Sequence, residues 1–241
     1  MELSIYYGVI IFLFGIVIGS FLNVLIYRLP KEISIAKGFS MCPKCTHRLM
    51  PVDLVPLFSW IFLKGKCRYC KEPIPFIYPA VELINGILWL LAYIMFGLSF
   101  SLISYFAILS CLLVVVFTDW QQMIIPDSMD VTILLAGILL IFISDSLPLK
   151  ERLIGLVCVS VPMLILALVS GGRAMGGGDI KLMAALGLCM GWKQTLLITF
   201  GGAVLGTITY LILLKTKNKM ARQIPYGTFL SIMGIISLLF G

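Results

Sequence analysis

Residues 102–119 read LISYFAILSCLLVVVFTD, an uncharged run that ends at an aspartate. The stretch Leu102–Thr118 has the length that a helix needs to cross the hydrocarbon of a bilayer, about 17–25 residues. An ionisable group at the edge of such a run is costly to keep, so Asp119 needs a functional explanation. The segment therefore predicts a membrane-spanning helix with a candidate functional acid at its end.

The composition of the whole chain agrees with a membrane protein. Of its 241 residues 61% are hydrophobic and 12% are charged, whereas soluble domains are about 45–50% apolar and about 25% charged. We therefore expect an all-α polytopic membrane protein with about eight transmembrane helices. The apolar runs lie at about Ser4–Ile26, Ile77–Gly97, Phe100–Thr118, Met129–Ser144, Leu153–Ser170, Ile180–Gly191, Thr195–Leu214 and Thr228–Phe240.

The basic residues predict the orientation of these spans. The formal net charge is +7, but the charges sort by loop, so no nucleic-acid partner is expected. With the N-terminus outside, the positive-inside rule is satisfied, because only Lys150, Arg152 and Lys193 fall outside. The inside loops hold Arg28, Lys31, Lys37, Lys44, Arg48, Lys64, Lys66, Arg68, Lys71, Arg173, Lys181, Lys215, Lys217, Lys219 and Arg222.

The apolar runs and the long polar loop between the first two of them divide the chain into three parts. Residues 1–27 form the first transmembrane helix, residues 28–76 a cytoplasmic loop domain, and residues 77–241 the main membrane-embedded domain. Asp119 and the loop domain then face the cytoplasm together, and so does a second isolated acid, Asp179.

Asp179 follows Gly176-Gly177-Gly178 and opens the run Ile180–Met190. Two carboxyl groups at the same depth can share one proton and activate a water, as in aspartic proteolysis. Helix capping is the simpler explanation for Asp179 and is compatible with catalysis. The glycines allow unusual backbone angles and the close approach of an extended peptide. Asp127 and Asp130 are rivals of Asp119 for the role of the second acid.

Two short cysteine pairs lie in the loop domain, Cys42-Pro43-Lys44-Cys45 and Cys67-Arg68-Tyr69-Cys70. Two C-x-x-C pairs at about this separation are typical of a four-thiolate zinc site. Disulfides or a redox motif are the alternatives, and a reducing cytoplasm disfavours disulfides. With four thiolates the metal is expected to be structural, shaping the loop without carrying the reaction. His47, the only histidine, is expected to face solvent.

Several motifs resemble those of the type IV prepilin peptidases, which are also called leader peptidase/N-methyltransferases. The likeness runs from about residue 8 to the C-terminus. It rests on Phe21–Pro30, the paired cysteine loop, Tyr78-Pro79-x-Val81-Glu82-Leu83, Asp119 with Ile125-Pro126-Asp127, Gly176–Asp179 and Ile224-Pro225-Tyr226-Gly227.

The resemblance implies an aspartic protease of the bacterial cytoplasmic membrane. Such an enzyme removes the basic leader of prepilin or pseudopilin substrates on the cytoplasmic side, while the substrate's apolar N-terminal helix stays in the bilayer. It also implies that Asp119 and Asp179 are the catalytic pair. Which of them is the base stays open, because coupled acids titrate together.

The resemblance further implies that S-adenosylmethionine methylates the new N-terminus in a step linked with the zinc loop. Gly65 and Lys66 are candidate cofactor contacts by position alone. One motif departs from the family: the usual Pro-Phe-Gly-Pro near the last span is Pro225-Tyr226-Gly227-Thr228 here. The oligomeric state and the particular substrates stay open.

The alternative from another class is a transporter or channel subunit with a cytoplasmic zinc-knuckle binding module. Intramembrane acids are frequent in ion and proton pathways. A transport pathway would place Asp119 and Asp179 near the middle of their spans, whereas proteolysis at the membrane surface would place them near span ends.

Overall fold

The computed structural model describes residues 2–144, 147–173, 175–215 and 224–241. Every regular element in these residues is a helix, apart from two isolated bridges, as the sequence predicted. The chain forms two compact units, Met1–Leu98 and Ser99–Gly241. The basic residues Lys217, Lys219 and Arg222, which were counted as inside, lie outside the described residues.

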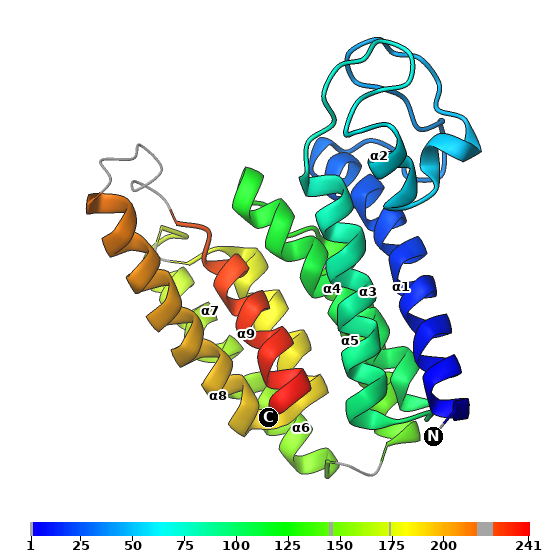
Figure 1. Cartoon of the computed structure of the whole chain (residues 1–241). Coiled ribbons are helices and arrows are strands. Elements are labelled where there is room, and N and C mark those ends of the chain that lie inside the picture. The colour runs from blue at the N-terminus through cyan, green and yellow to red at the C-terminus, as the bar shows by residue number, and fades with distance from the viewer. Residues whose placement is uncertain (1, 145–146, 174, 216–223) are drawn as a thin grey trace. The chain divides into compact units, whose positions relative to one another are not determined.

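The first unit is a pair of long helices with a loop domain between them (Figure 1). A methyl group on Gly15 would lie 2.9 Å from Cα of Gly86, and one on Gly19 would lie 2.7 Å from Cα of Glu82. The Gly15-x-x-x-Gly19 motif therefore lets the two helices touch along their backbones. The elements are α1 (Glu2–Arg28), η1 (Leu29–Lys31), η2 (Pro51–Leu54), α2 (Phe58–Phe62) and α3 (Ile77–Phe96).

The second unit is a helical bundle in which α8 contacts α5, α6, α7 and α9, and α4 contacts α5 and α9. The long α8 is two helical segments that meet at Gly191, whose φ of 77° breaks the helix. The two spans predicted from residue 180 to residue 214 correspond to these segments. The elements are α4 (Ser101–Gln122), α5 (Asp127–Ile143), α6 (Leu149–Cys158), α7 (Ser160–Val169), α8 (Gly177–Lys215) and α9 (Tyr226–Phe240).

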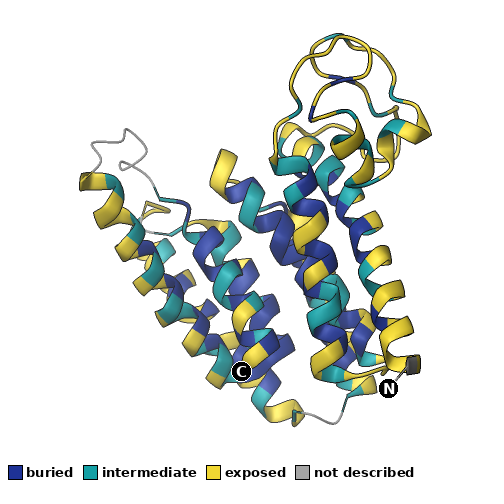
Figure 2. Cartoon of the chain, in the orientation of Figure 1, coloured by how far each residue is buried: buried dark blue, intermediate teal, exposed yellow. Residues whose placement is uncertain are grey.

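Five helices among the described residues are long and apolar enough to cross a membrane, against the eight spans expected. They are Leu3–Lys31, Ile77–Phe96, Ser101–Gln122, Leu149–Val169 and Gly177–Lys215. Helix α9, with 15 residues, is shorter than a full crossing, and α5, with 17 residues, lies at the lower limit of that length. Buried residues gather where helices face one another within each unit, and exposed residues lie on the outer faces (Figure 2). Many of the exposed residues are large and apolar, as on a lipid-facing surface.

Arg152 differs from its expected place in an outside loop. It lies within α6 and is 1% exposed. Its Nη1 donates to the carbonyl oxygens of Leu188 (3.3 Å) and Cys189 (3.0 Å). These carbonyls end the first segment of α8 just before Gly191, where a cation satisfies orphaned acceptors and opposes the negative end of the helix dipole. The charge of Arg152 therefore stabilises the end of a helix inside the bundle.

Candidate active site and cysteine cluster

Asp119 lies in the last turn of α4 and is 5% exposed. The helix ends at Met123, which adopts the left-handed conformation with φ of 56°. The N–H of Met123 donates to the carbonyl oxygen of Asp119 at 2.8 Å. The end of α4 thus fixes the backbone of Asp119 and directs its side chain toward α9.

Asp179 is the third residue of α8, in the first turn of the helix. Its carboxylate accepts a hydrogen bond from the backbone of Gly176, an arrangement typical of a helix start. Asp179 is therefore not the N-cap residue that the sequence suggested, because α8 begins two residues earlier, at Gly177. It instead satisfies the start of the helix from the third position, with Oδ2 near Gly176 and Oδ1 near Gly227. Gly176–Gly178 do not adopt the left-handed conformation, which occurs earlier, at Gly171 and Gly172.

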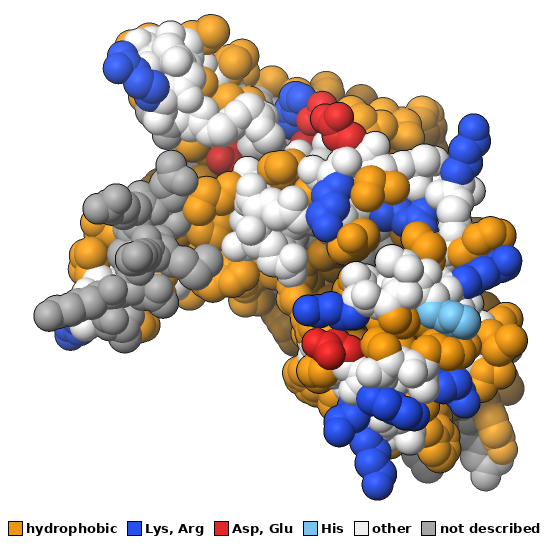
Figure 3. Space-filling view, turned by 90° about the horizontal axis from the view of Figure 1, so that it is seen from above, with side chains coloured by type: hydrophobic (Ala, Val, Ile, Leu, Met, Phe, Trp, Pro, Cys, Tyr) orange, Lys and Arg blue, Asp and Glu red, His pale blue; other side chains and the backbone are white. Residues whose placement is uncertain are grey.

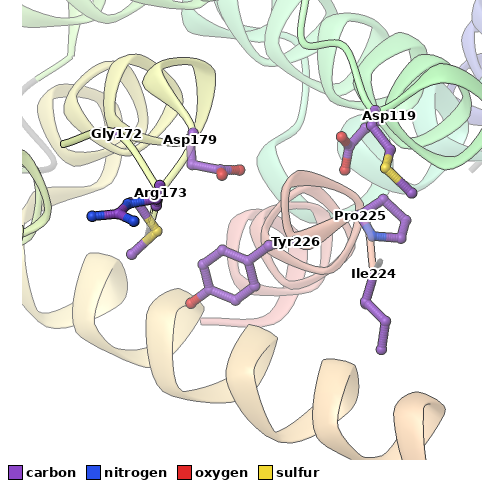
Figure 4. Close-up of a pocket in the computed structure, with 10 residues that line it drawn as sticks. Asp119, Gly172, Arg173, Asp179, Ile224, Pro225 and Tyr226 are labelled. Carbon is purple, nitrogen blue, oxygen red and sulfur yellow. The ribbon is translucent and has the colours of Figure 1, made fainter. Parts of the chain in front are cut away.

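The structure brings the two acids to one pocket of about 400 Å³ within the second unit. Figure 4 shows Asp119 and Asp179 entering it from different helices, with Pro225 and Tyr226 along one side. The pocket is lined by Asp119, Met123, Gly172, Arg173, Met175, Gly176, Asp179, Ile224, Pro225 and Tyr226. The sequence-based expectation that these two acids meet agrees with this geometry.

The backbone of Gly227 lies between the two carboxyl groups. A methyl group on Gly227 would lie 3.0 Å from Oδ2 of Asp119 and 3.1 Å from Oδ1 of Asp179. Both oxygens are therefore close to one point, and their separation is at most the sum of these two distances. A water or a peptide carbonyl can bridge carboxyl groups at such a spacing, because hydrogen bonds between oxygens span about 2.5–3.0 Å.

Ile125, in the turn after α4, holds the starts of α8 and α9 in register. A methyl group on Gly178 would lie 2.9 Å from Cβ of Ile125, and one on Gly227 would lie 2.5 Å from its Cδ1. Both glycines therefore accommodate the same isoleucine side chain. The turn that follows one acid thus sets the position of the helix that carries the other.

Thr228 is the direct partner of Asp119. Its backbone N–H donates to Oδ2 of Asp119 at 2.6 Å, and its Oγ1 donates to the same oxygen at 3.0 Å. Thr228 is 2% exposed, so both contacts are shielded from solvent. Asp119 is therefore tied to the first turn of α9.

The rival acids do not line this pocket. Asp127 is exposed and forms an ion pair with Nζ of Lys181 at 2.8 Å. Asp130 is 5% exposed, and neither of its carboxyl oxygens has a hydrogen-bond partner in the described part of the chain. Asp119 and Asp179 lie at helix ends, not near the middle of spans, which is the arrangement expected for hydrolysis and not for a transport pathway.

The four cysteines of the loop come together within the first unit. Their sulfur atoms all lie within 4.8 Å of one another, and Sγ of Cys42 is 3.8 Å from Sγ of Cys70. Tetrahedral zinc with Zn–S bonds of about 2.3 Å needs sulfur atoms at about this separation. The residues therefore fit a structural zinc ion held by Cys42, Cys45, Cys67 and Cys70.

The two cysteine pairs are folded alike. Each is enclosed by one isolated bridge, Met41–Arg48 around the first pair and Lys66–Pro73 around the second. In each, the residue after the second cysteine is left-handed and its N–H donates to the carbonyl of the first cysteine, at 2.9 Å for Thr46 and 3.0 Å for Lys71. Two equivalent knuckles thus present two sulfurs each to one point.

The cysteine sulfurs of the cluster differ in their tendency to ionise. Hydrogen bonds from the backbone of Cys45, opposed by burial, lower the pKa of Cys42 to about 7. The backbone of Glu72 lowers the pKa of Cys70, but burial and the three neighbouring sulfurs outweigh it and raise that pKa to about 12. A cation bound at the centre of the cluster would favour the thiolate form of all four cysteines, because metal ligands bind deprotonated.

Asp53 forms hydrogen bonds to the two residues between Cys67 and Cys70 in the second knuckle. Its carboxylate, whose side chain is 4% exposed, accepts hydrogen bonds from Nε of Arg68 at 2.5 Å and from the Tyr69 hydroxyl at 3.1 Å. Burial alone would raise the pKa of Asp53, but these bonds and the N–H of Met50 lower it below its usual value. His47 is exposed and stacks on the Tyr69 ring at 3.7 Å, which agrees with its expected place outside the cluster.

The loop also contains the two candidate cofactor contacts. Gly65 is buried, with φ of 68°, and a methyl group there would lie 2.9 Å from the Trp60 ring. The positive φ and the close contact with Trp60 therefore explain why this position is a glycine. Lys66 is exposed just before Cys67. A cofactor role for Gly65 and Lys66 stays a prediction.

Figure 3 shows the face that carries the single histidine, where blue Lys and Arg side chains lie among orange hydrophobic ones.

Sequence reasoning missed three residues that shape the pocket. Ile125 and Tyr226 belong to motifs that were noted, but their contacts depend on how α4, α8 and α9 pack. Thr228 carried a signal, since it replaces the proline usual in the family motif. Its meaning emerges only from the contact with Asp119, which is 109 positions away in the chain.

Fold and site together define a multi-pass helical membrane protein with two carboxyl groups at one pocket and a four-cysteine loop. Comparison with known proteins identifies its relatives. The family model described as "Bacterial Peptidase A24 N-terminal domain" matches residues 13–96, and "Type IV leader peptidase family" matches residues 106–211. The chain belongs to the type IV leader peptidase family, a family of peptidases.

Named relatives agree along almost the whole chain. A "Prepilin leader peptidase/N-methyltransferase" of Bacillus subtilis (strain 168) is 34% identical to this chain. The alignment covers 96% of this chain and 94% of the relative. Proteins of the same name from Aeromonas salmonicida (strain A449) and Klebsiella pneumoniae are 30% and 36% identical. They cover 98% and 80% of this chain, and 91% and 90% of their own. No solved structure matches the chain significantly.

Proposed function

We propose that this protein is a membrane-embedded aspartic endopeptidase that removes the basic leader of type IV prepilin-like substrates. The observation that carries the proposal is the pair formed by Asp119 and Asp179 on either side of the Gly227 backbone. The names of the relatives support the substrate class.

In the proposed reaction one carboxylate takes a proton from water as the water attacks the scissile carbonyl. The other, protonated, carboxyl donates to the carbonyl oxygen and stabilises the charge that develops there. The proton held by the first acid then passes to the leaving amine. Gly227 leaves room for the peptide, and the open space beside Gly177, where a methyl group would meet no atom, offers an approach for an extended chain.

We further propose that cleavage takes place on the cytoplasmic face of the bacterial inner membrane. The distribution of Lys and Arg supports an outside N-terminus and an inside loop domain. In this arrangement the chain crosses the membrane about eight times, with the two segments of α8 as separate crossings and the shorter α5 and α9 packed against neighbours. The substrate's apolar helix stays in the bilayer and its basic leader lies in the cytoplasm.

The cysteine loop is proposed to hold one structural zinc ion. The four sulfurs fill a tetrahedral shell, so the metal would shape the loop and leave the peptide chemistry to the carboxyl pair. N-methylation of the new N-terminus with S-adenosylmethionine is supported by the names of the relatives. Transfer of label from S-adenosylmethionine to a processed substrate tests this second activity, and its absence would leave a protease alone.

The experiment for the peptidase is a leader-cleavage assay in membranes with Asp119→Asn and Asp179→Asn. Each change keeps the shape of the side chain and removes the acid, and we expect each to slow cleavage by about 10²–10⁴-fold. Asp127→Asn is the matched control, because Asp127 is exposed and outside the pocket. Normal cleavage by both single variants would disprove the mechanism.

A further inference from the structure

The two acids have different hydrogen-bond partners. Oδ2 of Asp119 accepts from the backbone N–H of Thr228 at 2.6 Å and from its hydroxyl at 3.0 Å, which is nearer to the hydroxyl than its other acceptor, the carbonyl of Val116 at 3.4 Å. A backbone N–H can only donate, so this oxygen must be an acceptor. Hydrogen bonds donated to a carboxylate are stronger than bonds to a neutral oxygen, so this N–H favours the charged form of Asp119.

Among the described residues, Asp179 has fewer such donors. Its carboxylate accepts from the backbone of Gly176 and lies in the first turn of α8, where the positive end of the helix dipole also favours a negative charge. A hydrogen bond to a charged group contributes more than the dipole does. Because two donors bond to one of its oxygens, the ionised form of Asp119 is stabilised more than that of Asp179. When the two acids share a single proton, the negative charge therefore lies on Asp119.

Resting on the proposed function, we propose that Asp119 is the ionised acid that activates water, that Asp179 is the protonated acid that polarises the scissile carbonyl, and that Thr228 is the positioning residue that sets this order.

The proton balance follows from this assignment. The water oxygen bonds to the carbonyl carbon, its proton goes to Asp119, and the proton of Asp179 goes to the carbonyl oxygen. The carbon–nitrogen bond then breaks, the amine takes the proton from Asp119, and a hydroxyl of the tetrahedral intermediate returns a proton to Asp179. The products are a carboxylic acid and an amine, and the pair recovers its starting state.

The test is the pH dependence of leader cleavage in variants of Thr228. The acid limb of a pH–rate profile reports the base and the alkaline limb reports the acid. Thr228→Val removes the hydroxyl donor, and Thr228→Pro removes both donors at a first-turn position that tolerates proline. We expect the acid limb to move to higher pH by about one unit for each donor lost, while the alkaline limb stays.

Two further variants make the result specific. Thr228→Ser keeps both donors and should keep the acid limb of the wild type. Thr207→Val is the matched control, because the Thr207 hydroxyl bonds within α8, to the carbonyl of Ala203, away from the acids. If Thr228→Pro does not fold, Thr228→Val alone carries the comparison.

The outcomes separate the claims. Movement of the alkaline limb in the Thr228 variants would make Asp179 the base and overturn the assignment. Movement of neither limb would remove Thr228 from the reaction. Retained cleavage in Asp119→Asn and Asp179→Asn would instead overturn the proposed function, whatever the Thr228 variants do.

Discussion

Gly227→Ala places one methyl group between the two acids. The new carbon would lie 2.5 Å from Cδ1 of Ile125, 3.0 Å from Oδ2 of Asp119 and 3.1 Å from Oδ1 of Asp179. Overpacking of this kind costs about 1–3 kcal/mol. Replacing a helical glycine with alanine returns about 0.5–1 kcal/mol. The variant is therefore expected to fold, with a free energy of unfolding lowered by about 0–2.5 kcal/mol.

Its cleavage rate should fall much further. The methyl group displaces one or both carboxyl groups, and a misplacement of about 1 Å can cost about 100-fold in rate. Leader cleavage by purified protein gives the rate, and thermal unfolding in detergent shows that the variant is folded. Gly206→Ala is the matched control, since its methyl group would meet the Phe229 ring at an ordinary 3.4 Å.

A second variant isolates the cause. Ile125→Val removes the Cδ1 atom that crowds the new methyl group and leaves the two carboxyl contacts in place. Gly227→Ala combined with Ile125→Val should therefore remain slow. Full recovery of the rate in the double variant, or a normal rate in Gly227→Ala alone, would refute the idea that this glycine keeps the space between the acids open.

Three other predictions concern the scaffold. Arg152→Met keeps the volume of the side chain but leaves the carbonyl oxygens of Leu188 and Cys189 without a donor, at a cost of about 1–3 kcal/mol each. Thermal unfolding should therefore occur at a clearly lower temperature. An unchanged unfolding temperature would contradict the role of Arg152 as a donor to these carbonyls. Purified protein should carry one zinc ion per chain, and Cys67→Ser should lose it and expose the loop to proteolysis; a full zinc content in this variant would exclude the four-cysteine site. Asp53 has a lowered pKa in the folded protein, so it stabilises the loop above its unfolded pKa of about 3.9 and loses this effect as the pH falls through the folded value. Asp53→Asn should speed amide exchange in the loop near neutral pH, and its effect should shrink as the pH falls below the unfolded pKa toward the lowered folded pKa. Equal effects at neutral and acidic pH would exclude the charge as the cause.

Much of the site could be predicted because its residues are recognisable from short stretches of sequence. Two C-x-x-C pairs leave few geometries for four sulfurs, and the structure gathers them as the spacing indicated. Asp119 and Asp179 stood out because acids are rare at the ends of apolar runs. Both signals need only composition and spacing, which the chain displays directly.

What could not be predicted depends on contacts between distant segments. The use of Arg152 inside the bundle follows from the break at Gly191, which shortens the first segment of α8 and leaves its carbonyls to be capped. The partnership of Thr228 with Asp119 depends on how α9 packs against α4. Hydropathy locates apolar runs but not the ends of helices. Two of the eight predicted runs are joined in α8, and the helices α5 and α9 are short, so five helices among the described residues have the length and composition of a span.

The most direct test of the central claim is the cleavage rate of the double variant Asp119→Asn/Asp179→Asn beside the two single variants. Residues that act as one catalytic unit show losses that do not add. If the two acids form one pair, each single variant should be slowed by about 10²–10⁴-fold and the double variant should be little slower than either. Losses that multiply in the double variant, or a normal rate in either single variant, would contradict a shared catalytic pair.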